Sequence, residues 1–450
     1  MAATLPSRDP GVFRRAVIWL LFLGPFFFLS YGFANWMAAQ RESVGVLVFD
    51  WERGVPLWPW TIIPYWSIDL LYGLSFLLPR TRRGLDCHAL RLLTAQVVAV
   101  ACFLLFPLRF SFERPVLGGS FGWLFDLLMG FDKPFNQAPS LHIALLVILW
   151  VAYGRYARGG WRWLLHGWFA LIGLSVLTTW QHHFIDVPTG ALLGFLCVWL
   201  WPREVRWPLQ AWSLSGDPQR RRLAGLYGGG AALCLLVALA SGGFWLWLCW
   251  PAVSLALVAL CYLGIGPVGF QKRLDGRHST TITWLLAPYW LGAWLNARWW
   301  TRRHPQPDEV LPGLWLGRLP DGYAPLHEPS VAILDLCAEL PCTVPSRRYE
   351  CLPLLDLVTP SVEQCRQGAE LIQQLRADGP LLVCCALGYS RSATLVAAWL
   401  LIDGHAATVE EALAQVRRAR PQVVLKPEHL AVLAQLAGQP NLPQEVSHAG

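Results

Sequence analysis

The sequence predicts an all-α polytopic membrane bundle of about eight spans, followed by a soluble α/β domain. Apolar residues make up 55% of the 450 residues and charged residues only 14%, whereas soluble proteins carry roughly 25% charged residues. Tryptophan occurs 26 times, often near the ends of apolar runs, where the amphipathic indole favours the membrane–water interface. After residue 303 the pattern changes to short apolar strands and helices, which indicates a soluble α/β domain.

Eight apolar runs predict the membrane spans, since a helix needs about 20 apolar residues to cross a bilayer. The first run follows basic residues like a signal sequence, but it is long enough to favour an uncleaved anchor. The eight runs are Val12–Trp36, Leu57–Leu78, Ala89–Leu108, Leu141–Tyr153, Trp163–Thr179, Phe184–Trp201, Leu223–Ala240 and Phe244–Ile265.

Charge counting predicts the orientation, because cytoplasmic loops are enriched in lysine and arginine. With the N-terminus inside, eighteen basic residues up to Arg277 fall on the inner side and five on the outer side. The net charge of +7 therefore reflects topology rather than nucleic-acid binding. The twelve cysteines show no metal-ligand or disulfide-framework spacing, which suits a reducing compartment.

The segment Thr281–Trp300 leaves two topologies open. It is apolar, but it contains Pro288, Asn296 and Arg298, which favours a helix lying in the inner interface. If it forms a ninth span instead, everything after it lies outside.

The soluble region begins after a polar linker, His304–Glu309. We predict strands at Leu314–Leu316, Val331–Leu336, Leu352–Leu355 and Leu381–Cys384, and helices at Val362–Leu375, Ser392–Leu401 and Val409–Arg418.

The stretch from Leu381 to Thr394 carries the first candidate site. Cys385 follows a buried strand, Gly388 lies in the middle of the next loop, and a helix is expected to start at Arg391. The N–H groups of a tight loop at a helix N-terminus converge on an anion, and this field also favours a thiolate. We therefore predict Cys385 as nucleophile and Arg391 as bidentate phosphate ligand. The remaining predicted phosphate-binding residues are Ala386, Leu387, Gly388, Tyr389, Ser390 and Ser392.

Asp356 is the predicted general acid. It closes a strand 29 residues before Cys385 and begins the loop Asp356–Pro360, and a leaving alkoxide or phenoxide needs a proton. The alternative is an aspartate that caps a turn at a strand end.

These residues resemble the dual-specificity branch of the protein tyrosine phosphatases, over roughly Glu309–Leu436. The resemblance includes the segments "PGLWLGRLP" and "CCALGYSRSATLVAAWLL". It implies a domain of protein tyrosine phosphatase type that hydrolyses phosphomonoesters through a cysteinyl-phosphate, without metal or cofactor. One position departs from the family, since Cys384 stands where a histidine usually precedes the nucleophile. Cys384 is either a buried structural thiol or a point of redox control.

A second candidate site is divided between two outer segments. Ser140 and His142 open the fourth span, and His182 and Asp186 precede the sixth. If the sixth helix starts at His182, the two residues share a face, and the carboxylate orients the imidazole. The basic residues of the outer loops just before His142 are candidate phosphate ligands or ordinary snorkelling charges: Arg109, Arg114 and Lys133.

This second arrangement resembles the type 2 phosphatidic acid phosphatases, over roughly Arg14–Pro202. "PSLH" and "HxxxDV" match the two histidine motifs, and Arg114-Pro115 matches the end of the basic motif. The resemblance implies His142 as general acid, His182 as nucleophile and Asp186 as its orienting residue. Pro107 replaces the expected lysine, and Val176 follows Ser175 where arginine is usual. These departures leave a phosphomonoesterase and a headgroup phosphotransferase open.

We therefore expect a fused membrane enzyme, with four parts at residues 1–202, 203–303, 304–440 and a disordered tail at 441–450. The substrates are phosphoproteins or phospholipids, no nucleic acid is expected, and the location is a bacterial inner membrane with a cytoplasmic C-terminal domain. A non-catalytic, membrane-tethered phosphate sensor is the alternative, and the retained acid Asp356 argues against it. A transporter is disfavoured, because no broken-helix repeat is seen.

Overall fold

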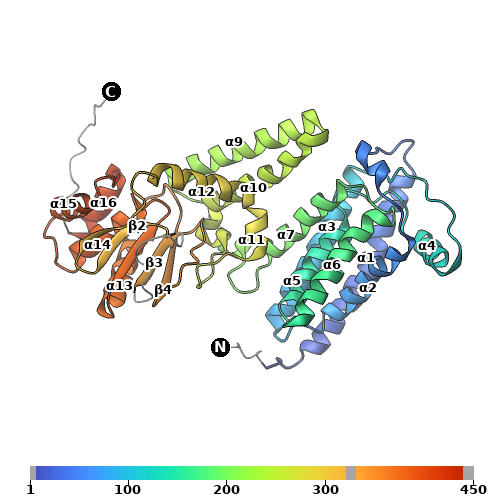
Figure 1. The fold of residues 1–450 in the computed structure, drawn as a ribbon, viewed down its shortest axis with the longest axis horizontal. Helices are drawn as coiled ribbons and strands as arrows, with labels where there is room; N and C mark the ends of the chain where they lie inside the picture. The colour runs from blue at the N-terminus through green and yellow to red at the C-terminus, as the bar shows by residue number, and fades with distance from the viewer. Residues whose placement is uncertain (1–6, 321–330, 439–450) are drawn as a thin grey trace. The chain divides into compact units, whose positions relative to one another are not determined.

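The computed structural model describes residues 7–320 and 331–438. The chain separates into two compact units, residues 1–209 and 210–450, which Figure 1 colours along the sequence. The predicted order, a helical N-terminal region with several apolar helices and a C-terminal α/β domain, is confirmed. The predicted tail 441–450 lies outside the described residues.

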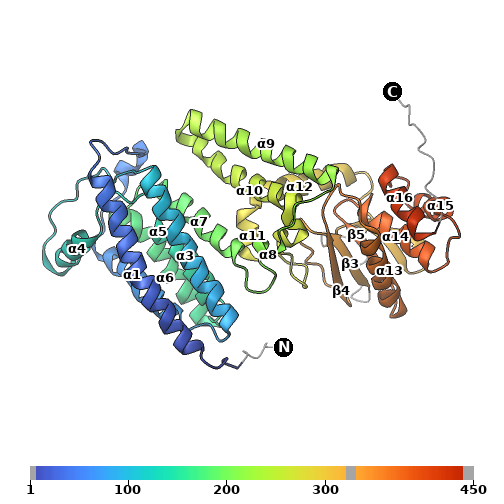
Figure 2. The ribbon, with the colours of Figure 1, turned by 180° about the vertical axis from the view of Figure 1, so that it is seen from behind.

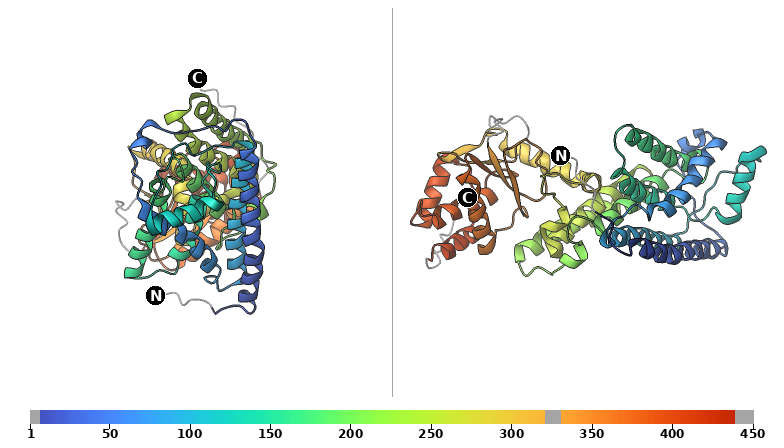
Figure 3. Two further views of the ribbon diagram at one scale, coloured as in Figure 1. Left: turned by 90° about the vertical axis from the view of Figure 1, so that its right-hand side faces the viewer. Right: turned by 90° about the horizontal axis from the view of Figure 1, so that it is seen from below.

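Unit 1 is built from helices whose small and apolar side chains pack together. Its central helices pair α1 with α3 and α5 with α7. Figure 3 shows the ribbon from two further sides. The sequence analysis did not predict α4. The helices are α1 (Val12–Ala39), α2 (Ile62–Ser75), α3 (Arg82–Leu105), α4 (Gly119–Phe131), α5 (Leu141–Gly154), α6 (Gly160–Thr178) and α7 (Asp186–Leu200), with short turns at Asp50–Gly54 and Pro59–Thr61 and α8 (Pro208–Ala211) at the unit boundary.

Four helical segments among the described residues are long and apolar enough to cross a membrane: Val12–Ala39, Arg82–Leu105, Pro218–Ser241 and Gly243–Phe270. Large apolar side chains such as Leu29 on α1 and Leu239 on α9 are exposed, as expected for lipid-facing surfaces. Two further apolar helices of this region, α5 and α7, are shorter. The count of eight spans stays a prediction.

Unit 2 begins with a helical part that precedes its sheet. The segment expected as one run at Phe244–Ile265 divides into η3, α10 and η4, and Thr281–Trp300 is broken at Leu286, where Pro288 cannot donate a helical hydrogen bond. The elements are α9 (Pro218–Ser241), η3 (Gly243–Leu248), α10 (Cys249–Leu260), η4 (Cys261–Ile265), η5 (Gly266–Phe270), α11 (Thr280–Leu285) and α12 (Ala287–Thr301).

A five-stranded sheet of order β1-β2-β5-β3-β4 forms the centre of the α/β part. Only β1 is antiparallel to its neighbour, and Figure 2 shows β5 beside β3. All four predicted strands and three predicted helices occur, and β1 and α16 were not predicted. The elements are β1 (Asp308–Leu311), β2 (Leu314–Arg318), β3 (Ala332–Cys337), β4 (Tyr349–Leu354), α13 (Val362–Ala377), β5 (Leu381–Cys385), α14 (Arg391–Ile402), α15 (Val409–Ala419) and α16 (Pro427–Leu436).

The two faces of this sheet are covered by different parts of unit 2. Successive strand residues point to opposite faces, so Val383 and Cys385 join the core formed with α13 to α16. Leu382 and Cys384 join a second core that contains Ala297 of α12. Helix α12, which precedes the predicted linker, is therefore a layer of the α/β fold.

Candidate active sites

The loop from Cys385 to Arg391 connects the end of β5 to the first residue of α14. The Cys385 Sγ accepts hydrogen bonds from the Gly388 N–H at 3.2 Å and the Ser392 hydroxyl at 3.3 Å. Both donors stabilise a thiolate more than a neutral thiol. The structure therefore brings the predicted nucleophile, its loop and Ser392 together at a helix N-terminus.

Gly388 gives the loop its tight curvature. Its φ is +77°, and a Cβ at this position would lie 2.4 Å from the backbone carbon of Gly317 on β2. Only glycine fits this conformation and this approach.

Arg391 is buried, and three acceptors hold its guanidinium. The two Nη atoms contact the Glu339 carboxylate at 2.9 and 2.6 Å, and Nη1 donates to the Leu354 carbonyl at 2.8 Å. The Asp356 Oδ1 lies 2.9 Å from Nη2. The predicted acid and the predicted phosphate ligand are therefore in direct contact, and Glu339, which the sequence analysis missed, fixes the arginine.

The two carboxyl groups that contact Arg391 have pKa values shifted in opposite directions. Burial alone would raise the pKa of Glu339, but Arg391 lowers it below its ordinary value. Burial raises the pKa of Asp356, with a further contribution from Glu339, and Arg391 only partly opposes this. Glu339 is thus the permanent counter-ion, and Asp356 is the carboxyl that more readily holds a proton. This division matches the requirement for a general acid.

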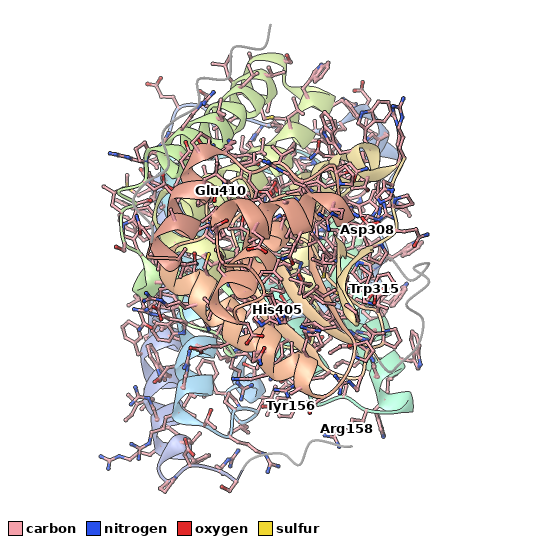
Figure 4. The ribbon with its side chains drawn as sticks, turned by 90° about the vertical axis from the view of Figure 1, so that its left-hand side faces the viewer. Tyr156, Arg158, Asp308, Trp315, His405 and Glu410 are labelled. Carbon is pink, nitrogen blue, oxygen red and sulfur yellow. The ribbon has the colours of Figure 1, made fainter. Side chains whose placement is uncertain are left out.

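Two further residues that the sequence analysis missed support the loop from behind. The buried Arg420 donates to the carbonyls of Gly388 at 3.1 Å and Leu387 at 3.3 Å, and it pairs with Asp308 at 2.7 Å; Asp308 is labelled in Figure 4. The Ser390 hydroxyl lies 3.0 Å from the His429 Nε2. Because Arg420 binds loop carbonyls, it favours an orientation in which loop N–H groups face the anion.

Cys384 lies on the sheet face opposite to Cys385. It is fully buried, it packs in the core that includes Ala297 of α12, and burial raises the pKa of its thiol. These properties favour the structural-thiol interpretation over redox control, because a reactive thiol needs access and thiolate character.

In unit 1, the Asp186 carboxylate, His182 and Ser140 form a hydrogen-bonded chain. The His182 Nδ1 lies 3.0 Å from the Asp186 Oδ2, and its Nε2 lies 3.1 Å from the Ser140 hydroxyl. The shared helical face was predicted on the condition that the helix starts at His182, and this condition is not met, since α7 begins at Asp186. A turn brings His182 to Asp186 instead, in which the N–H of His182 donates to the Val176 carbonyl at 3.1 Å.

His142 and Arg114 lie near this chain of residues. The His142 ring stacks on Tyr65 at 4.2 Å and interacts electrostatically with His182. Its Nε2 is a buried atom with no hydrogen-bond partner among the described residues. Arg114 donates to the Trp180 carbonyl at 2.9 Å.

Arg109 and Lys133 are not brought into this cluster. Both side chains are exposed, and among residues 7–320 and 331–438 neither is seen in a side-chain hydrogen bond or an ion pair. Their predicted role as phosphate ligands gains no support from this arrangement.

Several solved structures are similar to part of the chain. The chain is 27% identical to Tk-PTP in its active form, covering 30% of this chain and 99% of that one, with a TM-score of 0.27. It is 23% identical to human DUSP28 (29% and 95%, TM-score 0.27). It is 20% identical to PTPMT1 in complex with PI(5)P (29% and 94%, TM-score 0.25). No curated protein matches the chain.

Residues 332–439 match the family model of the dual specificity phosphatase catalytic domain. This match contains Cys385, Arg391 and Asp356, and it leaves residues 1–331 outside, so the resemblance of the N-terminal helical region to phosphatidic acid phosphatases stays a prediction. The C-terminal part of the chain is a dual-specificity phosphatase catalytic domain, and the chain is a phosphoric monoester hydrolase.

Proposed function

We propose that the protein is a membrane-embedded phosphatase whose Cys385 forms a cysteinyl-phosphate with phosphomonoesters. The observation that carries this is the pair of hydrogen bonds to the Cys385 Sγ from Gly388 and Ser392, at the start of a helix that also presents Arg391. Its substrates are phosphorylated Tyr, Ser or Thr side chains of proteins, or phospholipid headgroups.

The proposed reaction has two steps. The Cys385 thiolate attacks phosphorus, the ester P–O bond breaks, and Asp356 gives its proton to the leaving oxygen. Water then attacks the phosphocysteine and returns a proton to Asp356. The S–P bond breaks, phosphate leaves, and the Ser392 hydroxyl stabilises the departing thiolate. Arg391 and the loop N–H groups bind the phosphoryl oxygens throughout.

Hydrolysis of an aryl phosphate by the full-length protein tests this proposal. Cys385→Ser is expected to abolish it, because an alcohol at this position has no comparable anion. Activity that survives in this variant would contradict the proposal. A protein that binds phosphate and shows no turnover would instead be the membrane-tethered sensor.

We also propose a second activity, in which His182 attacks a phospholipid phosphate on the outer face of the membrane. The hydrogen bonds that link Asp186, His182 and Ser140 favour this activity, because a carboxylate fixes the imidazole. His142 is the proposed acid. Hydrolysis of phosphatidic acid, or headgroup transfer between lipids, is expected to fail in His182→Ala and to persist in Cys385→Ser.

The proposed location is a bacterial inner membrane, with eight spans and a cytoplasmic phosphatase domain. The excess of eighteen inner over five outer basic residues supports this orientation. A C-terminal tag is expected to be inaccessible to protease in intact cells. Accessibility from outside would indicate that Thr281–Trp300 spans the membrane.

A further inference from the structure

Two tyrosine hydroxyls connect the helical part of unit 2 to the loops of the cysteine site. Tyr262, on η4 at the end of the last candidate span, donates to the Asp356 carbonyl at 3.0 Å. Tyr389, within the loop Cys385–Arg391 (the phosphate loop), donates to the Trp300 carbonyl at the end of α12 at 3.2 Å. Both the loop Asp356–Pro360 (the acid loop) and the phosphate loop therefore form hydrogen bonds with elements that precede the phosphatase domain.

Tyr262 belongs to a packed aromatic cluster. Its side chain is 1% exposed, its ring stacks on Tyr227 of α9 with centroids 5.4 Å apart, and Tyr227 meets Tyr289 of α12 edge to face at 5.7 Å. All three tyrosines interact electrostatically with Asp356. The hydroxyl of Tyr262 is therefore held in place beside the acid loop, at little entropic cost to the hydrogen bond.

A buried ion pair fixes the segment that follows Tyr262 in the sequence. The Lys272 Nζ lies 2.6 Å from both the Asp335 Oδ2 and the Cys337 carbonyl, and the side chains of the pair are 1% and 0% exposed. The Cys342 N–H donates to the Gly276 carbonyl at 2.9 Å. Buried contacts therefore join the helical part of unit 2 to β3 and to the residues that follow it.

The acid loop itself needs support. Leu357, next to Asp356, has a φ of +58° and a side chain that is 56% exposed. A left-handed conformation of a leucine persists only where neighbouring contacts impose it. The Asp356 carboxylate accepts a hydrogen bond from the Leu357 N–H, and Tyr262 donates to the carbonyl of this same peptide group.

We propose that Tyr262 is a positioning residue of the phosphatase, which fixes the backbone of Asp356 so that its carboxyl group reaches the leaving oxygen. This proposal rests on the proposed role of Asp356 as general acid. It makes proton donation, and not phosphate binding, dependent on the membrane-proximal helices.

A leaving-group series in the full-length protein tests the proposal. An ester with a poor leaving group needs the acid, whereas 4-nitrophenyl phosphate, with a good one, needs it little. Tyr262→Phe is expected to lower kcat/KM, which reports the step that expels the leaving group, about 3- to 10-fold for phenyl phosphate, the range for one lost hydrogen bond. For 4-nitrophenyl phosphate kcat/KM stays nearly constant.

Tyr349→Phe is the matched control, because it removes another tyrosine hydroxyl of unit 2, which donates to the Asp335 Oδ2 at 2.8 Å. It is expected to change stability and to affect both esters equally. Equal losses for both esters in Tyr262→Phe would overturn the positioning role and leave a structural one.

Asp356→Asn distinguishes a failure of the role proposed for Tyr262 from a failure of the general-acid role proposed for Asp356. If Asp356→Asn shows the leaving-group dependence and Tyr262→Phe does not, the role of Tyr262 is wrong. If Asp356→Asn shows no such dependence, the general acid is misassigned and both proposals fail.

Discussion

The two candidate sites differ in how the chain assembles them. In unit 2, the nucleophile and the phosphate-binding groups come from the consecutive residues Cys385 to Ser392, between one strand and one helix. In unit 1, Ser140 and His182 meet across 42 residues of sequence. A contiguous loop carries its geometry in its own backbone, whereas a dispersed site depends on how several helices pack.

The same difference appears in the hydrogen bonds made by the two proposed nucleophiles. Cys385 receives a backbone N–H and a hydroxyl from its own loop and helix. His182 is oriented by the buried carboxylate of Asp186. The sulfur of Cys385 is thus contacted from one continuous segment, while the ring of His182 is held between Asp186 and Ser140, which lie on different helices or their caps.

Removal of the proposed acid has the largest expected effect among three changes that sharpen this comparison. Asp356→Asn is expected to lower the rate with phenyl phosphate by about 10²- to 10⁴-fold, the contribution of a positioned acid. The pKa of Asp356 is raised by burial, so the acid stays protonated above the usual aspartate range. The wild-type rate then falls as pH rises through that raised pKa, and the fall is absent in the variant. A pH–rate profile measures this, and an unchanged profile in the variant contradicts the assignment.

Loss of the arginine's counter-ion has the next largest effect. Glu339→Gln is expected to destabilise unit 2 by roughly 3 kcal/mol, because it leaves the buried Arg391 without its main partner. The folded-state pKa of Glu339 lies below its ordinary value, so its stabilisation is present above that ordinary value and disappears as pH falls through the folded-state pKa. The destabilisation is therefore largest near neutral pH. Denaturant titration of the purified protein measures it.

Glu350→Gln is the control for this experiment. Glu350 forms a partly exposed ion pair with Arg348, and such pairs contribute at most about 1 kcal/mol. If the two variants lose the same stability, the buried position of the Glu339–Arg391 pair has no special importance.

The smallest effects are expected for the exposed basic residues in the loops of unit 1. Arg109→Ala and Lys133→Ala are expected to change hydrolysis of phosphatidic acid by less than about twofold, because both side chains are exposed. Arg114→Ala is expected to lower it more, since Arg114 interacts electrostatically with Asp132 and Tyr65 beside His142. A larger loss in Lys133→Ala than in Arg114→Ala would reverse this order.

The sequence predicted the parts of the sites that depend on local geometry. A buried strand, a mid-loop glycine and a helix start placed Cys385 and Arg391 correctly within the loop. Glu339 was missed, although it follows β3 as Asp356 follows β4, and the carboxyl ends of these parallel strands meet at one edge.

Tyr262 and Arg420 had no such signal. Their contacts with Asp356 and Gly388 span 94 and 32 residues of sequence. Long-range contacts of this kind depend on tertiary packing, which periodicity and motif spacing do not encode. The contact between His182 and Asp186 was predicted on the condition that a helix starts at His182, whereas the turn before α7 brings the two residues together.

The central claim is that phosphomonoester hydrolysis passes through the sulfur of Cys385. The most direct test is to quench the full-length protein during turnover of an aryl phosphate and locate the phosphoryl group by mass spectrometry. We expect a phosphoryl group on Cys385 and none in Cys385→Ser. A phosphoryl group on His182, with none on Cys385, would contradict the account.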